Sequence, residues 1–317
     1  MSFPTFTPRS TADEVAAAFA EQISGKTVLI TGTSVTGLGF SSARAMAKYA
    51  GLLIITGRRP HKIQEAVDAI KAEHPSANVR PLTLDLGSFA SVRKAAAEVN
   101  AYPEPLHVLI HNAAAEMGPF VLSEDKLESQ FASDHVGPFL FTKLLAPKLL
   151  ASSARVVVVS SGAHAQGTID WATLAAPDAS TYHPLAGYAQ AKLANVLFAK
   201  ALTARSGGRI QAFSLHPGAI DTSSAAGGET FKTLQAVGIF TPEGKPNTEM
   251  VQWKTLAEGG ATTIAAAFDP RIEGKGGAYL EDSAITEQGI NPAALEPANA
   301  DKLWTVTEEI VGEKFTF

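Results

Sequence analysis

Tyr188 and Lys192, in the stretch "YAQAK", are the residues of this chain best suited to acid and base chemistry. They stand four positions apart, so in a helix they share one face. A free tyrosine, with a pKa near ~10, is a poor acid or base at neutral pH, but a nearby cation stabilises its phenolate. Lys192 can supply that cation. Because tyrosine and lysine at this spacing are also common on helix surfaces, the pair needs support from the rest of the chain.

A glycine-rich turn lies in "VLITGTSVTGLGF", which begins at Val28 as an apolar strand and ends in a helical stretch. Gly32 is followed by four residues before Gly37, and Gly39 comes next, so the spacing differs from the G-x-G-x-x-G pattern of dinucleotide sites. Such a turn lets backbone N–H groups approach a phosphate at the positive end of the helix dipole. The alternative is a tight turn that needs glycine for its conformation alone.

The next strand ends in "TGRRP" and lacks the carboxylate that usually binds the ribose 2′-hydroxyl of NAD about 20 residues after the glycines. Arg58 stands there instead, and a planar guanidinium suits bidentate contact with a 2′-phosphate. We therefore predict NADP rather than NAD. In the alternative interpretation, Arg58 and Arg59 are a solvated pair at the start of a helix.

Three further strand ends carry polar side chains. Asp85, in "LDLGS", could accept a hydrogen bond from an adenine amino group or cap the next helix, although Ser88 suits the cap better. Asn112 is followed by three small residues, which either permit close approach of a cofactor or form a plain turn. The fifth strand ends in Ser160 and Ser161.

The insertion 162–187 carries four residues with polar or aromatic side chains that could reach a substrate. They are His164, Trp171, Tyr182 and His183. In the alternative interpretation they are loop residues satisfied locally. The eight histidines of the chain are scattered and form no H-x-x-x-H pair, so we predict no metal site.

These residues need elements that bring them together, and apolar runs that alternate with helical stretches predict such a frame. The apolar runs are "TVLIT" at 27, "LLIIT" at 52, "VRPLTL" at 79, "LHVLI" at 106, "RVVVVS" at 155 and "RIQAFSL" at 209. The helical stretches are 38–50, 60–74, 88–100, 123–150 and 185–206. The alternation predicts an α/β protein with a doubly wound parallel β-sheet, a three-layer α/β/α Rossmann fold. Ligands of such sheets bind outside the carboxyl ends of the strands.

We expect the 317 residues to form a single Rossmann-fold domain, 1–317. Its N-terminal extension, 1–24, adds one surface helix capped by Ser10 or Thr11. A helix at 249–268, a strand from 276 and a helix at 298–312 close the domain. The stretch at about 221–250 predicts a substrate lid, whose apolar residues either line a pocket or pack on the core. The candidates are Phe231, Phe240, Met250 and Trp253.

Composition excludes several classes of function. The formal net charge of −5 and the absence of a dense run of Lys and Arg argue against a nucleic-acid partner. The chain has no cysteine, which excludes disulfides and thiolate nucleophiles and fits a reducing compartment, so we predict a cytoplasmic location. No secretory apolar region and no uninterrupted apolar run of about 18 residues is present, so we predict no membrane anchor.

Taken in order, these motifs resemble those of the short-chain dehydrogenase/reductase family. The likeness runs from about residue 26 to 220 and includes the glycine turn, Asn112, Ser161, the pair Tyr188 and Lys192, and "HPGAIDT" at 216. The strings "RVVVVSSGAH" and "YAQAKLANVLFAKAL" are similar to the branch that includes retinol-dehydrogenase-like enzymes and many fungal oxidoreductases. Five motifs in family order make the resemblance specific.

The resemblance implies a role for each matching residue. Tyr188 would be the general acid and base, Lys192 its electrostatic partner and a ribose ligand, and Ser161 the donor that orients the substrate oxygen. Ser160 would be structural. The residues that would contact NADP(H) are Gly32, Thr33, Ser34, Thr36, Gly37, Leu38, Gly39, Arg58, Asp85, Leu86, Asn112, Tyr188, Lys192, Pro217, Gly218, Ile220 and Thr222.

Two positions depart from the family pattern. The glycine turn holds an extra residue, which leaves open whether Thr33, Ser34 or Thr36 touches phosphate. In "DHVGPF", Asp134 stands where many family members have an asparagine that holds a water beside the lysine. If Asp134 faces Lys192, its charge offsets part of the field that activates Tyr188, or it relays protons, and the substitution Asp134→Asn should shift the pH–rate profile. An unchanged profile would make Asp134 a structural group beside His135.

The resulting prediction is an NADP(H)-dependent ketoreductase or alcohol dehydrogenase whose substrate is a hydrophobic small molecule of the kind found in secondary metabolism. One alternative is an epimerase, dehydratase or isomerase that uses Tyr188 and Lys192 without net redox change. Another is a catalytically silent NADP(H)-binding regulator, although such a protein has no need of the tyrosine hydroxyl. Family members often form dimers or tetramers through the long helices before and after the fifth strand, so a homo-oligomer stays open.

Overall fold

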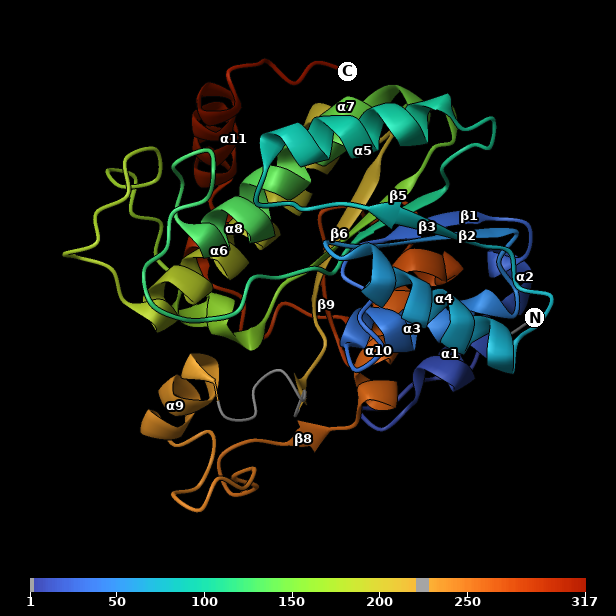
Figure 1. The fold of residues 1–317 in the computed structure, drawn as a ribbon, viewed down its shortest axis with the longest axis horizontal. Helices are drawn as coiled ribbons and strands as arrows, with labels where there is room; N and C mark the ends of the chain where they lie inside the picture. Colours follow the sequence, from blue (N-terminus) through green and yellow to red (C-terminus); the bar gives the residue numbers. More distant parts are fainter. Residues whose placement is uncertain (1–2, 221–227) are drawn as a thin grey trace.

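One twisted, mostly parallel sheet forms the centre of the molecule, with helices on both of its faces (Figure 1). The structure is a computed structural model, which describes residues 3–220 and 228–317. The strand order is β10-β9-β6-β5-β4-β1-β2-β3. Every adjacent pair in it is parallel except β9 with β10. The predicted α/β fold class is therefore confirmed.

The strands follow the apolar runs of the sequence. They are β1 (Thr27–Ile30), β2 (Leu52–Gly57), β3 (Val79–Thr83), β4 (Val108–His111), β5 (Arg155–Val159), β6 (Gln211–His216), β9 (Tyr279–Glu281) and β10 (Ala284–Ile285). Strand β1 pairs with both β2 and β4, so the winding reverses direction there. In a sheet of this kind the crevice at such a reversal receives the ligand.

Side chains of each central strand alternate between two hydrophobic layers. Val28 and Ile30 pack into the layer that holds α1 (Ala12–Ala18), α2 (Ala20–Ile23), α3 (Leu38–Ala47), α4 (Pro60–Glu73) and α10 (Leu256–Phe268). Leu29 points to the opposite layer, which holds α5 (Phe89–Ala101), α7 (Gly137–Ala151), α8 (Pro184–Arg205) and α11 (Pro297–Val311). Burial on both faces explains why the strands read as continuous apolar runs.

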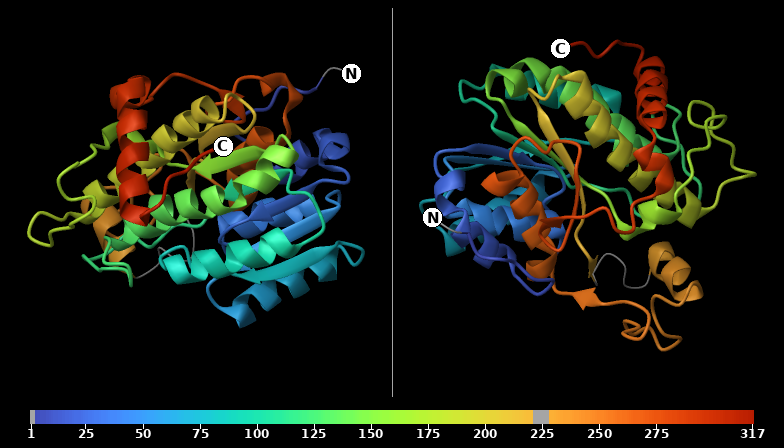
Figure 2. Two further views of the ribbon diagram at one scale, coloured as in Figure 1. Left: turned by 90° about the horizontal axis from the view of Figure 1, so that it is seen from above. Right: turned by 180° about the vertical axis from the view of Figure 1, so that it is seen from behind.

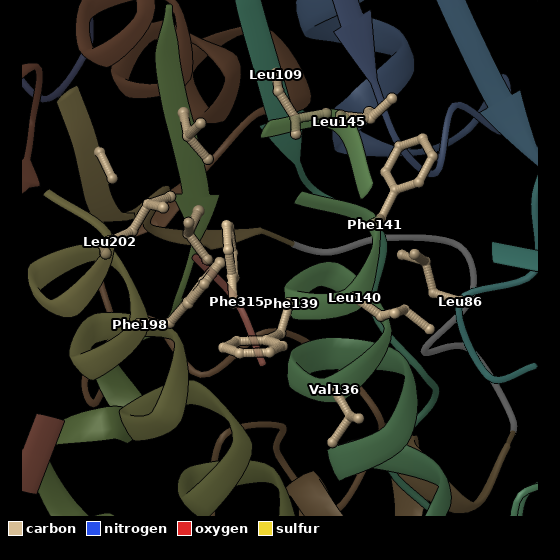
Figure 3. Close-up of a cluster of buried hydrophobic side chains, with 14 of the residues drawn as sticks. Leu86, Leu109, Val136, Phe139, Leu140, Phe141, Leu145, Phe198, Leu202 and Phe315 are labelled. Atoms are coloured by element: carbon tan, nitrogen blue, oxygen red, sulfur yellow. The ribbon is translucent and has the colours of Figure 1, made fainter. Parts of the chain in front are cut away.

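The C-terminal segment covers the outer faces of α7 and α8 (Figures 2 and 3). Phe139 of α7 lies 5.4 Å from Phe315 and 4.9 Å from Trp304, measured between ring centroids, and Phe198 of α8 lies in the same cluster. Glu313 pairs with Lys143 of α7. A homo-oligomer through these two helices stays a prediction, and it would have to displace or include this segment.

The ends of several elements differ from the sequence-based prediction. The helix expected at 123–150 begins as the short α6 (Ser129–Phe131), passes through a π-helical turn, Ala132–Val136, and continues as α7. The predicted start of the helix at 249–268 is wrong. Helix α10 begins at Leu256, because Thr255 caps it in a reciprocal capping box with Glu258. The two residues before the cap, Trp253–Lys254, form β8, which pairs with β7 (Ala219–Ile220).

The N-terminal extension is more than a surface helix. Thr11, rather than Ser10, caps α1 and forms a capping box with Glu14. Val15 and Phe19 are fully buried against α10 and α3. Residues 3–24 therefore close one of the two hydrophobic layers.

The stretch predicted to be a lid lies apart from the two helical layers (Figure 1). From Gly228 onward it contains α9 (Glu229–Ala236) and a series of turns that lead to β8. Its first part, 221–227, lies outside the described residues, as does Thr222, one of the predicted cofactor contacts. Among the described helices, none has the length and apolar character needed to cross a membrane.

Candidate active site

The glycine turn after β1 is fixed to the end of β4 by hydrogen bonds. Asn112 Nδ2 donates to the carbonyl oxygens of Thr31 and Gly32, at 2.9 and 3.0 Å. The backbone N–H groups of Asn112 and Ala113 donate to Thr31 Oγ1, both at 3.0 Å. Asn112 therefore holds the turn in place, a role that its position after a strand did not reveal.

The first and last glycines of the turn have no room for a side chain. Gly32 has a φ of +73°, and a Cβ there would lie 2.7 Å from the Cα of Ala113. A Cβ on Gly39 would lie 2.4 Å from the carbonyl oxygen of Gly32. Helix α3 begins at Leu38, and no side chain caps its Gly37 end. Its first N–H groups therefore suit an anion such as a phosphate.

A small cavity of about 70 Å³ lies between the glycine turn and the end of β2. It is lined by Thr33, Ser34, Thr56, Gly57, Arg58, Arg59, Lys62 and Ile63. Three of these side chains are cationic and none is acidic, although Lys62 also pairs with Glu65 on the same helix turn, at 2.8 Å. Thr33 is buried, and its hydroxyl donates to the carbonyl of Thr56, which leaves the exposed Ser34 and Thr36 as the accessible hydroxyls of the turn. A polyanionic group fits this cavity better than a ribose diol does.

The end of β3 is shaped by Asp85. Its Oδ1 accepts from the N–H of Gly87 at 2.9 Å, while Ser88 caps α5, as the sequence favoured. Leu86 is buried, and its carbonyl oxygen lies against Gly137 so closely that a Cβ on Gly137 would approach it to 2.1 Å. The contact of Asp85 and Leu86 with an adenine stays a prediction.

Tyr188, Lys192 and Asp134 meet at the start of α8. Lys192 Nζ lies 2.8 Å from Asp134 Oδ2, and both side chains are buried, with exposed fractions of 3% and 0%. The same Nζ lies 5.4 Å from the ring centroid of Tyr188, which is half-buried. The sequence left open whether Asp134 faces Lys192, and in the structure the two form a direct ion pair.

Local backbone structure places Asp134 in this contact. It sits in the π-helical turn Ala132–Val136, and its second oxygen, Oδ1, accepts from the N–H of Ala115 at 2.7 Å. The π-turn widens the helix by one residue, an arrangement that is frequent at functional sites. Asp134 thereby links the loop after β4 to α8.

The charges of this pair depend on each other. Burial lowers the pKa of Lys192, but the carboxylate of Asp134 and the phenol of Tyr188 more than offset this effect and raise it above its usual value. Burial raises the pKa of Asp134, against the opposing influence of Lys192 and the Ala115 N–H. Lys192 thus stays protonated through the physiological range, next to an acid that takes up a proton more readily than an exposed aspartate does.

The end of β5 is tied to α8 so that Ser161 and Tyr188 keep a fixed relation. Ser160 Oγ donates to the backbone carbonyl of Lys192 at 2.7 Å, in line with a structural role. Asn195 Nδ2 donates to the carbonyl of Val159 at 3.1 Å. Sequence reasoning missed Asn195, whose signal was an amide in the apolar stretch "KLANVLF".

Ser161 has the geometry of a hydrogen-bond donor. Its Oγ accepts from the N–H of Ala163 at 3.2 Å, so its own O–H hydrogen can point elsewhere. The side chain is half-buried at the start of a 3₁₀ turn, Gly162–Gln166.

His164 lies beneath this turn rather than on its surface. Its Nδ1 is 2.6 Å from the carbonyl oxygen of Ser161, and its ring packs on Tyr279 at 4.8 Å. Burial lowers the pKa of His164, and it lowers the pKa of the nearby His216 to about 4, so both are neutral at physiological pH. The contacts favour the structural alternative for His164.

The remaining predicted substrate residues fall into two groups. Phe231, Phe240 and Trp253 pack on one another, with ring centroids 4.9 and 5.1 Å apart, and Phe240 is buried at their centre. Met250 is the exposed member of that stretch. Tyr182 lies elsewhere: its hydroxyl receives a hydrogen bond from Gln130 and is 3.2 Å from the carbonyl of Gly118.

Tyr182 and His183 line a cavity of about 210 Å³ beside the insertion 162–187. The residues of α8 that face it are Ala186, Gly187 and Gln190. At about 100° per residue, these positions lie on a different side of α8 from Tyr188 and Lys192. The structure therefore does not bring Tyr182 to Tyr188 and Lys192, and its contact with a substrate stays a prediction.

The segment after β6 flanks the same end of the sheet. Gly218 has a φ of +98°, which a residue with a side chain rarely adopts, and Ile220 lies in β7. Pro217 is buried, and Ile220 packs on Gly259 of α10. Among the described residues, no three His, Asp or Glu side chains converge as metal ligands would.

Comparison with known proteins places the chain among its relatives. The family model described as short chain dehydrogenase matches residues 26–231. The WW domain-containing oxidoreductase of Danio rerio is 36% identical over 305 residues, 93% of this chain and 71% of the relative. The polyprenol dehydrogenase of Mus musculus is 37% identical over 272 residues, which are 83% and 77% of the two chains. Retinol dehydrogenase 14 of Homo sapiens is 33% identical over 306 residues, 91% and 87%.

Solved structures share the fold. The 3-oxoacyl (acyl-carrier-protein) reductase of Agrobacterium tumefaciens C58, solved with NADP bound, aligns with a TM-score of 0.62 at 20% identity and covers 81% of this chain and 93% of its own. At this level of identity the likeness concerns the fold alone.

Because the ion pair between Asp134 and Lys192 is buried, we expect Asp134→Asn to destabilise the protein strongly. The change leaves the charge of Lys192 buried without a counter-charge, so we expect the free energy of unfolding at pH 7 to fall by about 3 kcal/mol. Denaturant unfolding measures this. Asp301→Asn is the matched control, because it breaks an exposed pair with Arg205 and should cost less than about 1 kcal/mol. Equal losses in the two variants would show that the buried Asp134 pair contributes no more to the free energy of unfolding than an exposed pair does.

Proposed function

The chain belongs to the short-chain dehydrogenase family, in its retinol-dehydrogenase-like branch, and we propose that it is an NADP(H)-dependent oxidoreductase acting on a ketone or secondary alcohol. The observation that carries the choice of cofactor is the cavity beside the glycine turn, where Arg58, Arg59 and Lys62 converge without an acidic residue. A 2′-phosphate is the part of NADP that such a group would recognise.

The described residues fit a dinucleotide along the carboxyl edge of the sheet. Gly32 and Gly39 let the turn pack closely on the end of β4, and the uncapped start of α3 at Gly37 would receive the pyrophosphate. Ser34 and Thr36 belong to the same turn. Asp85 and Leu86 would border the adenine, and residues 217–220 would lie along the nicotinamide. Asn112 would act through its hold on the glycine turn.

When bound, the nicotinamide supplies or accepts the hydride. Tyr188 would hold the proton that the substrate oxygen gains or loses, and Ser161 would orient that oxygen through its free O–H. Lys192, kept protonated by Asp134, stabilises the phenolate form of Tyr188 across about one helix turn. The negative charge of Asp134 reduces this stabilisation, so Asp134 sets how strongly Lys192 acts.

We propose that the substrate is a hydrophobic small molecule. The cluster Phe231, Phe240 and Trp253 supports this idea, because it gives the stretch from α9 to β8 an apolar body next to the segment 217–220. Two relatives are named for polyprenol and for retinol, which are apolar alcohols. A place in secondary metabolism and a cytoplasmic location belong to the same proposal; a relative in Brassica napus carries a chloroplastic name.

Equilibrium binding of NADPH and NADH tests the choice of cofactor. We expect NADPH to bind more tightly, and Arg58→Ala to weaken NADPH binding by about 10- to 100-fold while NADH binding stays the same, because only the 2′-phosphate loses a charged hydrogen bond. The control is Arg209→Ala, which removes an exposed arginine on the loop after α8 whose Nε donates to the carbonyl of Ser206 at 3.0 Å. An equal effect of Arg58→Ala on both nucleotides would contradict the proposed 2′-phosphate site.

Removal of one hydroxyl tests catalysis. Tyr188→Phe should lower turnover on a ketone panel by at least about 100-fold, since the proton donor is lost, and should leave NADPH binding nearly unchanged. Tyr49→Phe is the matched control, because Tyr49 also lies 5.4 Å from a lysine, Lys48, far from the sheet edge. Substrate conversion without net consumption of NADPH would favour an epimerase, dehydratase or isomerase instead. Full activity of Tyr188→Phe would remove Tyr188 from the mechanism.

The pH–rate profile tests the part played by Asp134. In Asp134→Asn, burial lowers the pKa of Lys192 with no carboxylate to offset it, so the lysine is less often charged and stabilises the Tyr188 phenolate less. The limb of alcohol oxidation that rises with pH should therefore move to higher pH. The rates are compared with those of Asp301→Asn, whose profile should equal that of the unchanged protein. A profile that Asp134→Asn leaves in place would give Asp134 a purely structural role.

A further inference from the structure

A second buried lysine, Lys254 of β8, lies outside the residues considered so far. Its side chain is only 6% exposed, and its Nζ is 2.5 Å from Asp282 Oδ1. Burying a lysine is costly unless it is paired. Its position next to the segment 217–220 suggests why this pair is present.

The methylene stem of Lys254 supports the backbone of Gly218. A Cβ on Gly218 would lie 2.5 Å from Lys254 Cδ and 2.9 Å from Cε, so the lysine stem lies directly against the glycine. The next residues, Ala219 and Ile220, pair in parallel with Trp253 and Lys254. Lys254 therefore contacts the segment that follows β6 in two ways: its backbone pairs with Ile220, and its side chain packs on Gly218.

The partner of Lys254 is itself held in place. Asp282 and Ser283 connect β9 and β10 and have φ values of +50° and +63°, a left-handed conformation that is uncommon without glycine. Two such residues form the tight turn of a β-hairpin. The N–H of Ser283 donates to the buried Thr262 Oγ1 of α10 at 3.1 Å. The backbone of Asp282 is thus held in place at the edge of the sheet by the hairpin turn and by this hydrogen bond.

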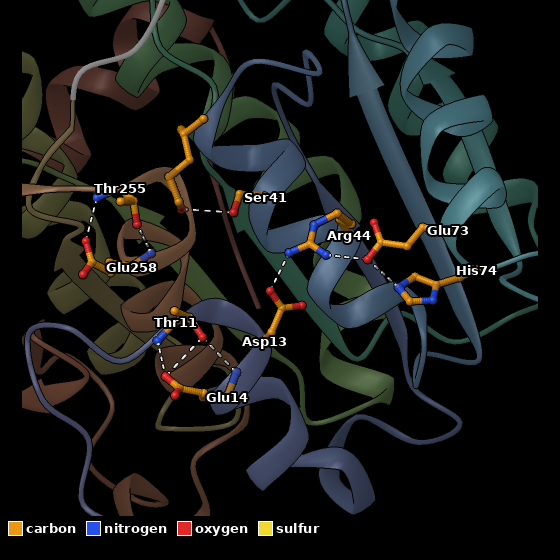
Figure 4. Close-up of polar contacts among 10 residues, drawn as sticks. Thr11, Asp13, Glu14, Ser41, Arg44, Glu73, His74, Thr255 and Glu258 are labelled. Carbon is orange, nitrogen blue, oxygen red and sulfur yellow. Dashed lines mark hydrogen bonds and ion pairs between the residues drawn. The ribbon is translucent and has the colours of Figure 1, made fainter.

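The other side of β8 is tied to the N-terminal extension and to the helix after the glycine turn. Arg9 donates to the carbonyl of Trp253 at 2.8 Å. Ser41 of α3 donates to the carbonyl of Leu256 at 3.0 Å, next to the Thr255 capping box (Figure 4). The backbone around Lys254 is therefore anchored on both sides and can act as a rigid support.

We propose that Lys254 is a positioning residue, whose ion pair with Asp282 sets the backbone of residues 217–220 and thereby the position of the nicotinamide ring. This inference rests on the proposed function, because it assumes that the nicotinamide lies along that segment. Lys254 acts through Gly218 and contacts no reacting atom. A displacement of about 1 Å at such a support can reduce a rate by about 100-fold.

The test is a titration with NADPH that needs no identified substrate and is followed by the fluorescence of the bound nicotinamide. In Lys254→Met we expect the dissociation constant to change by less than about threefold, because the Arg58 cavity at the other end of the cofactor is intact. The emission should move toward that of free NADPH, since the ring loses its fixed surroundings. Lys254→Arg, which can still pair with Asp282, should restore the emission.

Two further variants keep the test decisive. Lys275→Met removes an exposed lysine far from β8 and should change neither quantity. If Lys254→Met does not fold, Asp282→Asn replaces it, because it removes only the charge of the partner and should shift the emission in the same direction. Emission equal to that of the unchanged protein in both variants overturns the inference. A protein that binds no NADPH at all would instead contradict the proposed function.

Discussion

The ion pair between Lys192 and Asp134 is the interaction on which the candidate site depends. Both groups are buried, so each is stable in its charged form only while the other stays within contact distance. This requirement fixes the distance between α8 and the π-helical turn before α7, and through Ala115 it also fixes the loop after β4. Tyr188, one turn from Lys192, takes its place as a consequence.

Sheet topology explains why residues from distant parts of the sequence meet at one edge. Strands β1, β4 and β5 run parallel, so the glycine turn and the ends of β4 and β5 lie at the same edge of the sheet, and the reversal of winding at β1 opens a crevice there. Side-chain hydrogen bonds then remove the remaining freedom between these ends. Asn112 joins β4 to the glycine turn, and Ser160 and Asn195 join β5 to α8. Two separate supports, the Arg58 cavity and Lys254, lie at opposite ends of the proposed cofactor site.

Sequence reasoning predicted the sheet and the family, because apolar runs and ordered motifs can be read directly along the chain, but it left open whether Asp134 faces Lys192. It misplaced the start of α10, although the spacing of Thr255 and Glu258 was a readable capping box. It did not find the pair of Lys254 with Asp282, since two charged residues 28 positions apart give no signal until the chain has folded. The orientation of His164 toward the carbonyl of Ser161 is likewise a product of tertiary packing.

The central claim is that the chain transfers a hydride between a nicotinamide and a carbonyl carbon while Tyr188 handles the proton. The most direct measurement uses NADPH deuterated at the transferable position, with a panel of hydrophobic ketones and mass analysis of the products. Our account predicts one deuterium on the carbinol carbon of the alcohol formed, and at least about 100-fold less of this deuterated alcohol from Tyr188→Phe in the same time. Conversion of a substrate with no deuterium in its product would contradict it.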